Sequence, residues 1–238
     1  PNAGKGLLKA KLSDVLDLFV KAGYELNVYP TQSYKDAYYK IVDMDDVFDM
    51  VVCSGGDGTL DEVVTGMMKR EKKHRIPIGY IPTGTTNDFA SSLHISRDIM
   101  EAANTTVRGE AFACDIGTFN RDIFVYVAAF GLFTDVSYGT QQELKNLLGH
   151  MAYILEGAKS LSTIKSYPMK FSYDDQVIEG DFIYGMITNS MSVGGFTGLM
   201  GPGVELNDGL FEVTLVRNPK NVVEFNELLT ALLNKDFS

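Results

Sequence analysis

Gly55-Gly56-Asp57-Gly58-Thr59-Leu60-Asp61-Glu62 is the most informative stretch of this chain, and we call it the octet. It follows a short apolar run at residues 50–53 and precedes apolar residues at helical spacing, which predicts a strand, a glycine turn and a helix. A helix start presents backbone N–H groups and the positive end of the helix dipole, so it favours phosphate. Because Asp57 would repel phosphate, its presence indicates a divalent cation between the two. The octet therefore predicts a nucleotide site that uses a metal ion.

The composition limits the class of protein. The chain has 238 residues, 45% of them hydrophobic, which suits one large domain or two modest ones. Its net charge of −10 argues against nucleic acid as a general partner, because phosphate backbones bind basic surfaces. Cys53 and Cys114 lie in apolar contexts, which fits a reducing cytosol better than a disulfide framework. The longest apolar run, residues 123–130, is too short for a spanning helix of about 20 residues, so no transmembrane segment is predicted.

The periodicity predicts an α/β chain with two domains. Residues 1–108 alternate helix and strand patterns, as in a parallel-sheet nucleotide domain, with strands predicted at 24–29, 50–53 and 77–81. Helices are predicted at 12–19, 33–42, 60–70 and 96–104, and the basic run 69–75 is interpreted as a solvated helix end. Residues 109–238 are predicted as a mainly antiparallel, β-sandwich-like domain with strands at 111–119, 122–130, 169–173, 177–188 and 210–217 and a helix at 141–161.

Three glycine-containing loops carry the polar residues: Pro1–Gly6, the octet and Pro82–Ala90. The second and third follow predicted strands, and the first should follow one, so we expect a first strand to be missing from this sequence. Taken alone, each loop could be an ordinary tight connection, and Thr-Thr-Asn-Asp is good N-capping chemistry. Together they project to the carboxyl edge of a parallel sheet, where ligands bind in open α/β folds. Their glycines, hydroxyls and carboxylates are the equipment for phosphoryl transfer with Mg²⁺.

With these loops the chain resembles the diacylglycerol kinase catalytic-domain family, whose relatives include bacterial lipid kinases, sphingosine kinases and ceramide kinase. The matching stretches cover nearly the whole chain and are Pro1–Gly4, Gly55–Glu62, Pro82–Ala90, 115–117, 194–196 and 206–211. The octet is shared with NAD kinases, whereas the pairing of Pro82–Ala90 with Leu-Asn-Asp-Gly-Leu-Phe is most similar to soluble bacterial diacylglycerol kinases. The resemblance implies a first domain like those of NAD kinases and phosphofructokinases, ATP and Mg²⁺ as cofactors, and a lipid acceptor at a membrane surface.

The resemblance also implies roles for individual residues. Those implied to contact ATP are Asn2, Ala3, Gly4, Thr31, Gly56, Asp57, Gly58, Thr59, Leu60, Asp61, Glu62 and Thr85. Asp57, Asp88 and Asp115 would organise Mg²⁺ and phosphate, partly through water. A structural Mg²⁺ would use the Asp208 carboxylate and the backbone carbonyls of Glu205 and Leu210, since oxygen ligands suit this ion. An ordinary turn is the alternative interpretation of residues 207–209.

The sequence departs from the family in one respect. The proposed general base of these kinases lies in an Asp-Gly-Glu triplet near the C-terminus, and this sequence contains no such triplet. We therefore expect the base to lie in a C-terminal segment beyond Ser238. Asp57 is the best candidate in this sequence for deprotonating the acceptor hydroxyl, and the equal alternative is that it only holds metal.

The leading hypothesis is an ATP- and Mg²⁺-dependent lipid kinase that phosphorylates the primary hydroxyl of diacylglycerol and gives phosphatidic acid. The octet leaves open an NAD kinase-like enzyme with a soluble substrate. The absence of the triplet leaves open a non-catalytic nucleotide-binding module. The lipid hypothesis predicts a cytoplasmic protein that contacts the membrane peripherally, and it is compatible with a homodimer.

Overall fold

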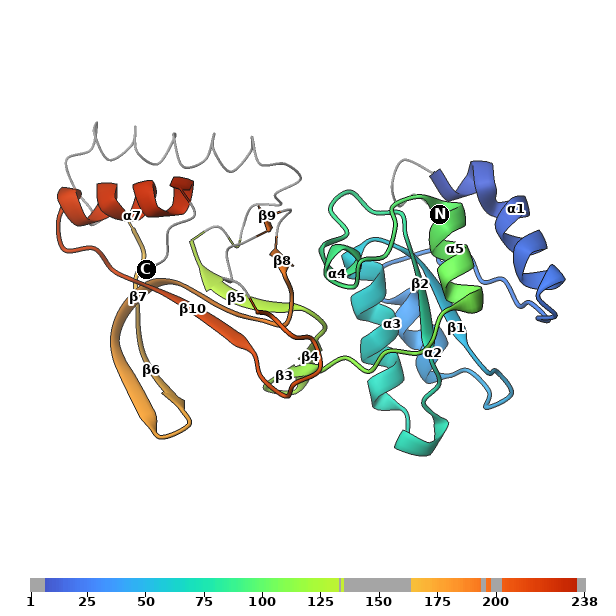
Figure 1. The fold of residues 1–238 in the computed structure, drawn as a ribbon. Helices are drawn as coiled ribbons and strands as arrows, with labels where there is room; N and C mark the ends of the chain where they lie inside the picture. Colours follow the sequence, from blue (N-terminus) through green and yellow to red (C-terminus); the bar gives the residue numbers. More distant parts are fainter. Residues whose placement is uncertain (1–6, 133, 135–163, 194–195, 198–202, 235–238) are drawn as a thin grey trace. The chain divides into compact units, whose positions relative to one another are not determined.

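A computed structural model of the protein describes residues 7–132, 134, 164–193, 196–197 and 203–234. The chain forms two compact units, coloured from blue to red along the sequence in Figure 1. The first comprises Pro1–Tyr126 with Leu206–Asp208, and the second comprises Val127–Glu205 with Gly209–Ser238. The domain boundary expected at residues 108–109 lies earlier than the division between these units, and residues 109–126 group with the first.

The first unit is built on a parallel pair of strands. β1 (Val51–Gly55) pairs with β2 (Ile78–Pro82), and Cys53 lies opposite Tyr80. The helix α3 (Asp57–Lys69) and the short 3₁₀ turn η2 (Lys72–His74) connect the two strands. This order of strand, glycine turn, helix and strand is the one that the octet predicts.

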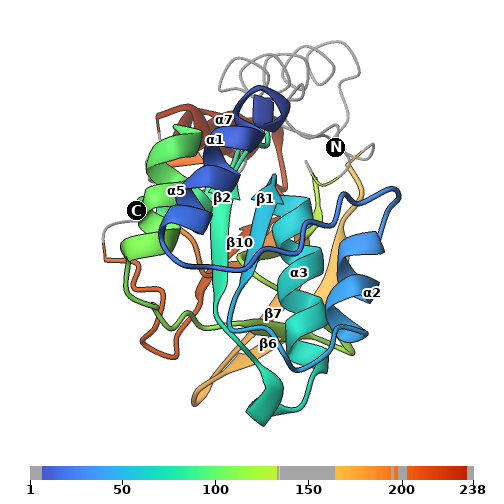
Figure 2. The same ribbon diagram turned by 90° about the vertical axis from the view of Figure 1, so that its right-hand side faces the viewer.

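Helices cover both faces of this sheet, as Figure 2 shows. Alternate residues of a strand point to opposite faces, so Tyr80 packs with α3 and α2 (Asp36–Val42), whereas Ile81 packs with α1 (Leu7–Lys21) and α5 (Ile99–Arg108). The buried apolar residues of the first cluster are Ala37, Ile41, Cys53, Leu60, Val63, Met67, Tyr80, Phe89, Ala90 and Val125. The second cluster contains Val15, Phe19, Ile81, Ala102 and Ala103.

Local sequence sets the helix ends of this unit. The backbone at Gly23, just after α1, has a φ of +92°, a conformation that glycine adopts without strain. At the start of α5 the Asp98 carboxylate accepts N–H groups from Met100 and Glu101, both at 2.9 Å. This is the usual way in which an N-cap side chain satisfies the first turn. α4 (Asp88–Ser92) is a short helix that begins inside the Pro82–Ala90 loop.

The strand predicted at residues 24–29 is wrong. The structure assigns no strand to residues 24–32, and every residue from 24 to 30 is exposed. An alternating pattern gives a strand only when a neighbouring strand supplies backbone hydrogen-bond partners. Among the described residues, β1 pairs with β2 alone, and no strand pairs with this segment.

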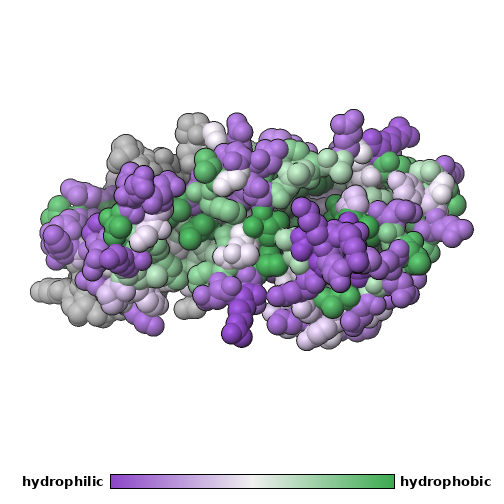
Figure 3. Space-filling model, turned by 90° about the horizontal axis from the view of Figure 1, so that it is seen from below, coloured by the Kyte–Doolittle hydropathy of each residue, from purple (hydrophilic) through white to green (hydrophobic). Residues whose placement is uncertain are grey.

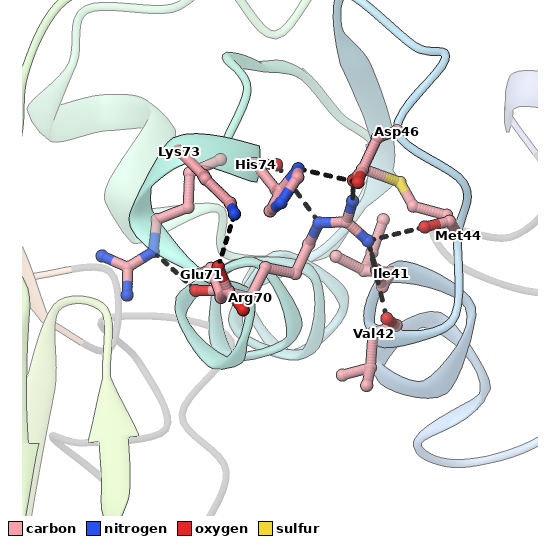
Figure 4. A network of polar contacts seen from close by, with 9 residues as sticks. Ile41, Val42, Met44, Asp46, Arg70, Glu71, Lys73 and His74 are labelled. Carbon is pink, nitrogen blue, oxygen red and sulfur yellow. Dashed lines mark hydrogen bonds and ion pairs between the residues drawn. The ribbon is translucent and has the colours of Figure 1, made fainter.

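The interpretation of the basic run 69–75 as solvated is wrong for Arg70. Its side chain is only 6% exposed, and Figure 4 shows how its guanidinium joins the end of α3 to the end of α2. Nη1 donates to the carbonyls of Ile41 (3.0 Å) and Met44 (2.7 Å), Nε donates to His74 O (3.2 Å), and Nη2 pairs with Asp46. A cation therefore satisfies backbone carbonyls at a helix C-terminus, where the helix dipole favours positive charge.

The second unit contains an antiparallel sheet centred on β7 (Gln176–Thr188). β6 (Tyr167–Tyr173) pairs with the first half of β7 and β5 (Val127–Gly131) with its second half, while β10 (Glu212–Arg217) lies along the other edge. The other elements among the described residues of this unit are β8 (Ser192–Val193), β9 (Phe196–Thr197) and α7 (Val222–Asn234). A hairpin of β3 (Gly117–Phe119) and β4 (Asp122–Phe124) belongs to the first unit.

The fold class is the predicted one, with a parallel sheet followed by antiparallel sheets. The predicted strand 122–130 is divided into β4 and β5, which belong to different units. The helix predicted at 141–161 lies outside the described residues. Exposed apolar side chains such as Tyr34, Val47 and Val223 occur in both units, and Figure 3 shows hydrophobic residues surfacing among hydrophilic ones.

Candidate active site

The octet and the Pro82–Ala90 loop approach each other through two glycines. Gly56 directly precedes α3, and a Cβ added to it would lie 3.1 Å from the Cα of Gly84. A Cβ added to Gly84 would overlap the Cα of Gly56 and lie 2.7 Å from Asn87 Oδ1. The Thr83 N–H also donates to the Gly55 carbonyl at 2.8 Å, so the contact continues the pairing of β1 with β2. Side chains at either glycine would force the two loops apart.

Asp57 ties the two loops together. It is the first residue of α3, and its two carboxylate oxygens accept the backbone N–H groups of Asp88 and Phe89, each at 3.2 Å. Burial raises the pKa of Asp57, although these hydrogen bonds favour the charged form, and the negative charge of Asp88 raises the pKa further. Two of the predicted site residues, Asp57 and Asp88, therefore lie side by side at the ends of adjacent parallel strands.

Two tyrosines lie within electrostatic range of these carboxylates. Burial raises the pKa of Tyr80 and of Tyr126, and the charges of Asp57 and Asp88 raise both further. The Tyr80 hydroxyl lies 3.3 Å from Gly55 O and 3.5 Å from Asn87 Oδ1. Both phenols therefore stay neutral and keep their ordinary donor and acceptor capacity at neutral pH.

Glu62 connects the octet to the segment that carries Thr31. Its Oε1 accepts the backbone N–H of Lys35 at 2.9 Å, and Lys35 immediately precedes α2. Asp36 fixes the same segment, since its carboxylate accepts the Gln32 N–H at 2.6 Å. The structure therefore gives Glu62 a structural contact in addition to the ATP contact predicted for it.

The remaining octet residues differ in their environment. Thr59 is half-buried, with its side chain against Gly55, whereas Gly58 and Thr85 are exposed. Leu60 is buried in the core between α3 and the sheet. Burial raises the pKa of Asp61, even though Val125 donates a backbone N–H to it, and the charge of Glu62 acts in the same direction.

The predicted metal residues are only partly described by the structure. The N–H of Asp115 donates to the Leu206 carbonyl at 2.8 Å, so Asp115 is joined to the segment that carries Asp208. Glu205, Asp208 and Leu210 are all exposed, but Asp208 groups with the first unit and the other two with the second. No group of three or more His, Cys, Asp or Glu side chains capable of holding a metal occurs among the described residues. The ligand sets expected from the sequence stay predictions, and Asn2, Ala3 and Gly4 lie outside the described residues.

Comparison with known proteins then identifies the family. The model of the diacylglycerol kinase catalytic domain matches residues 1–119. A diacylglycerol kinase from Staphylococcus saprophyticus subsp. saprophyticus is 36% identical over 231 residues, which cover 97% of this chain and 74% of the relative. This chain belongs to the diacylglycerol kinase catalytic-domain family. A second member, a diacylglycerol kinase from Staphylococcus aureus (strain JH9), is 37% identical over 97% of this chain and 72% of its own length.

Solved structures of family members agree with this fold. The crystal structure of a putative diacylglycerol kinase from Bacillus anthracis str. Sterne superposes with a TM-score of 0.77 at 26% identity, over 100% of this chain and 78% of that chain. A crystal structure of a diacylglycerol kinase from the same strain gives a TM-score of 0.74, also at 26% identity, over 98% of this chain and 74% of that chain. Membership of the family makes this chain a lipid kinase and therefore a transferase.

Sequence reasoning did not single out Tyr80 or Asn87 as site residues. Tyr80 was part of an apolar strand pattern, and Asn87 of a capping string. The structure gives Asn87 a left-handed backbone (φ 54°, ψ 51°) without a side-chain capping bond to α4. The available signal was that Asn tolerates this conformation better than most residues.

Proposed function

We propose that this chain uses ATP and Mg²⁺ to phosphorylate the primary hydroxyl of diacylglycerol, giving phosphatidic acid. The observation that supports this most directly is the joining of the two loops by Asp57, through the N–H groups of Asp88 and Phe89 at 3.2 Å each. These loops follow β1 and β2, and ligands of open α/β sheets bind beyond the carboxyl ends of the strands. The relatives that are named diacylglycerol kinase support the choice of acceptor.

The surroundings of Asp57 fit a divalent cation. Its pKa is raised because burial and the nearby Asp88 both disfavour its charge. Within the described residues, no Lys, Arg or His forms an ion pair with Asp57. A cation would supply the missing positive charge, and carboxylate oxygens are ligands that Mg²⁺ prefers. When bound with ATP, Mg²⁺ neutralises charge on the β- and γ-phosphates.

We assign Asp57 to holding the loops and the cation rather than to removing the proton of the acceptor. Both of its carboxylate oxygens accept backbone N–H groups, so both are already engaged in holding the Pro82–Ala90 loop. Thr59 and the backbone of Gly56 and Gly58 would contact the phosphates from the first turn of α3, where the helix dipole favours them. The location of the general base, in a segment beyond Ser238, stays a prediction.

The enzyme would bind its lipid acceptor at a membrane surface. Among the described residues, no helix has both the length and the apolar content needed to cross a bilayer. We propose that the protein contacts the bilayer peripherally and takes the diacylglycerol hydroxyl from its surface. With a net charge of −10, this contact would rely on local features rather than on general attraction to anionic lipid.

The test is transfer of labelled γ-phosphate from ATP with the full-length gene product and diacylglycerol in mixed micelles. We expect Mg²⁺-dependent formation of phosphatidic acid that EDTA abolishes. A sphingoid base and NAD, each offered separately, test the acceptor. Labelled NADP without labelled lipid would overturn the proposal in favour of a soluble-substrate kinase, and ATP binding without transfer to any acceptor would favour a non-catalytic module.

A further inference from the structure

Tyr80 lies directly beneath the point where the two loops meet. Its side chain is 4% exposed and packs in the core between the sheet and α3. Its hydroxyl lies 3.3 Å from the Gly55 carbonyl, which belongs to the octet, and 3.5 Å from Asn87 Oδ1, which belongs to the Pro82–Ala90 loop. A buried tyrosine hydroxyl normally requires a partner, and both atoms here are acceptors.

Asn87 offers a fixed acceptor to this hydroxyl. Its Oδ1 accepts the Gly84 N–H at 2.9 Å, and its Nδ2 donates to the Gly84 carbonyl at 3.0 Å. The carboxamide cannot turn over without losing both hydrogen bonds, and Asn87 is only 3% exposed. The Tyr80 hydroxyl has one proton, so it contacts one acceptor in each loop through a shared, three-centre hydrogen bond.

Other polar contacts also join the loops. Among them are the Thr83 N–H to Gly55 O bond and the two N–H groups that Asp57 accepts. The close approach of Gly56 and Gly84 limits how near the loops come but does not stop them from separating. The Tyr80 hydroxyl, which lies on the buried side, opposes separation of the two loops.

We propose that Tyr80 is a positioning residue for phosphoryl transfer, whose hydroxyl holds the octet and the Pro82–Ala90 loop at the spacing that Asp57 requires. This inference rests on the proposed function, because it concerns the geometry of the same site. The hydroxyl distances are long for O–H···O bonds, and hydrogen bonds of an active site commonly tighten when the ligand binds. Positioning contributes strongly to transfer reactions, since a misplacement of about 1 Å costs roughly 100-fold in rate.

The test is Tyr80→Phe in the full-length enzyme, which removes the hydroxyl and leaves the ring in the core. We expect kcat to fall about tenfold, because the loops should shift by less than the ~1 Å that costs roughly 100-fold. The KM for ATP should change less. Tyr38→Phe is the matched control, because Tyr38 is a half-buried tyrosine of α2 in the same unit that packs edge-to-face on Tyr39. That variant should keep the wild-type kcat. A Tyr80→Phe enzyme whose kcat stays within twofold of wild type would overturn the proposal.

A second measurement separates this inference from the proposed function. Hydrogen exchange of the Thr83 and Phe89 amides, which donate to Gly55 O and Asp57, reports the loop contact without any turnover. We expect both amides to exchange faster in Tyr80→Phe, whether or not the protein phosphorylates diacylglycerol. Lower kcat with unchanged exchange at both amides would show that Tyr80 does not act through loop spacing. An inactive wild-type protein with faster exchange in the variant would reject the function alone.

Discussion

The two ends of α3 differ in how completely protein atoms compensate a buried charge. At the C-terminal end, the Arg70 guanidinium meets the carbonyls of Ile41, Met44 and His74 and the carboxylate of Asp46. At the N-terminal end, Asp57 accepts two backbone N–H groups but has no ion-pair partner among the described residues. Arg70 is fully compensated by protein atoms, whereas the charge of Asp57 is only partly compensated.

This difference separates a structural charge from a functional one. A buried cation that is hydrogen-bonded on all sides contributes to the native state mainly because its removal would leave polar groups unsatisfied. A carboxylate with a raised pKa, beside a second carboxylate, favours any ligand that brings positive charge. The same helix thus has a stabilising end and an end for which we propose ligand binding. Substitutions at the two ends should accordingly affect different measurements.

The largest expected effect is on turnover in Asp57→Ala. Loss of the carboxylate removes the proposed cation ligand and releases the N–H groups of Asp88 and Phe89, so we expect kcat to fall by more than about 100-fold. The melting temperature should change little, because relief of the buried charge offsets the lost hydrogen bonds. Phosphate transfer from ATP and thermal unfolding measure the two effects separately. Turnover at the wild-type rate would contradict the role given to Asp57.

Arg70→Met should give the largest loss of stability. The methionine keeps much of the buried volume, but the carbonyls of Ile41 and Met44 lose their donor, which predicts a loss of about 3 kcal/mol in the free energy of unfolding. For a chain of this size that corresponds to a fall of roughly 6–12 °C in melting temperature. The matched control is Lys73→Met, since the Lys73 side chain is 70% exposed and, in the described part of the chain, pairs only with an exposed Glu71. If both variants melt within about 2 °C of wild type, Arg70 is not the structural charge described here.

The sequence indicates the role of one end of α3 much better than that of the other. The glycines, Asp57 and Asp88, which the structure brings together, were singled out because tight turns and clustered carboxylates are unusual away from a site. Arg70 was assigned to solvent because a basic run has the same composition whether its side chains point outward or fold back over a neighbouring helix. Only the position of the α2 carbonyls distinguishes the two, and that position depends on tertiary packing.

Tyr80 and the segment 24–29 show the same limit of sequence patterns. Tyr80 matches an apolar strand pattern as well as any core residue, and its hydroxyl gains a role only through Gly55 and Asn87 on other segments. Residues 24–29 alternate like a strand but are exposed and form none in the structure. Periodicity describes which face of a segment is apolar, whereas strand formation and polar contacts also require a partner.

Gly84→Ala should give an intermediate effect confined to the loops. Its Cβ would overlap the Cα of Gly56 and press on Asn87, so the loops must separate. We expect KM for ATP to rise about tenfold and the free energy of unfolding to fall by about 1–3 kcal/mol. Gly58→Ala is the control for stability, since its Cβ would meet nothing within 4 Å and alanine favours the helix by about 0.5–1 kcal/mol. Equal melting temperatures for the two variants would contradict a close contact between Gly56 and Gly84.

Asp61→Asn, one turn inside α3, tests the smallest effect and has a defined pH dependence. Burial raises the folded-state pKa of Asp61 above its ordinary value of 3.8, although a backbone N–H from Val125 opposes this, and the charge of Glu62 adds to the rise. Folded wild type therefore holds this proton more tightly than unfolded chain, so the contribution of Asp61 to stability is present below pH 3.8 and is lost as the pH rises through the raised pKa. Asparagine keeps an oxygen for the Val125 N–H and carries no charge. The melting temperature of the variant minus that of wild type should consequently increase with pH across this window and level off above it. A difference that stays constant from pH 4 to pH 7 would show that the buried charge of Asp61 costs nothing.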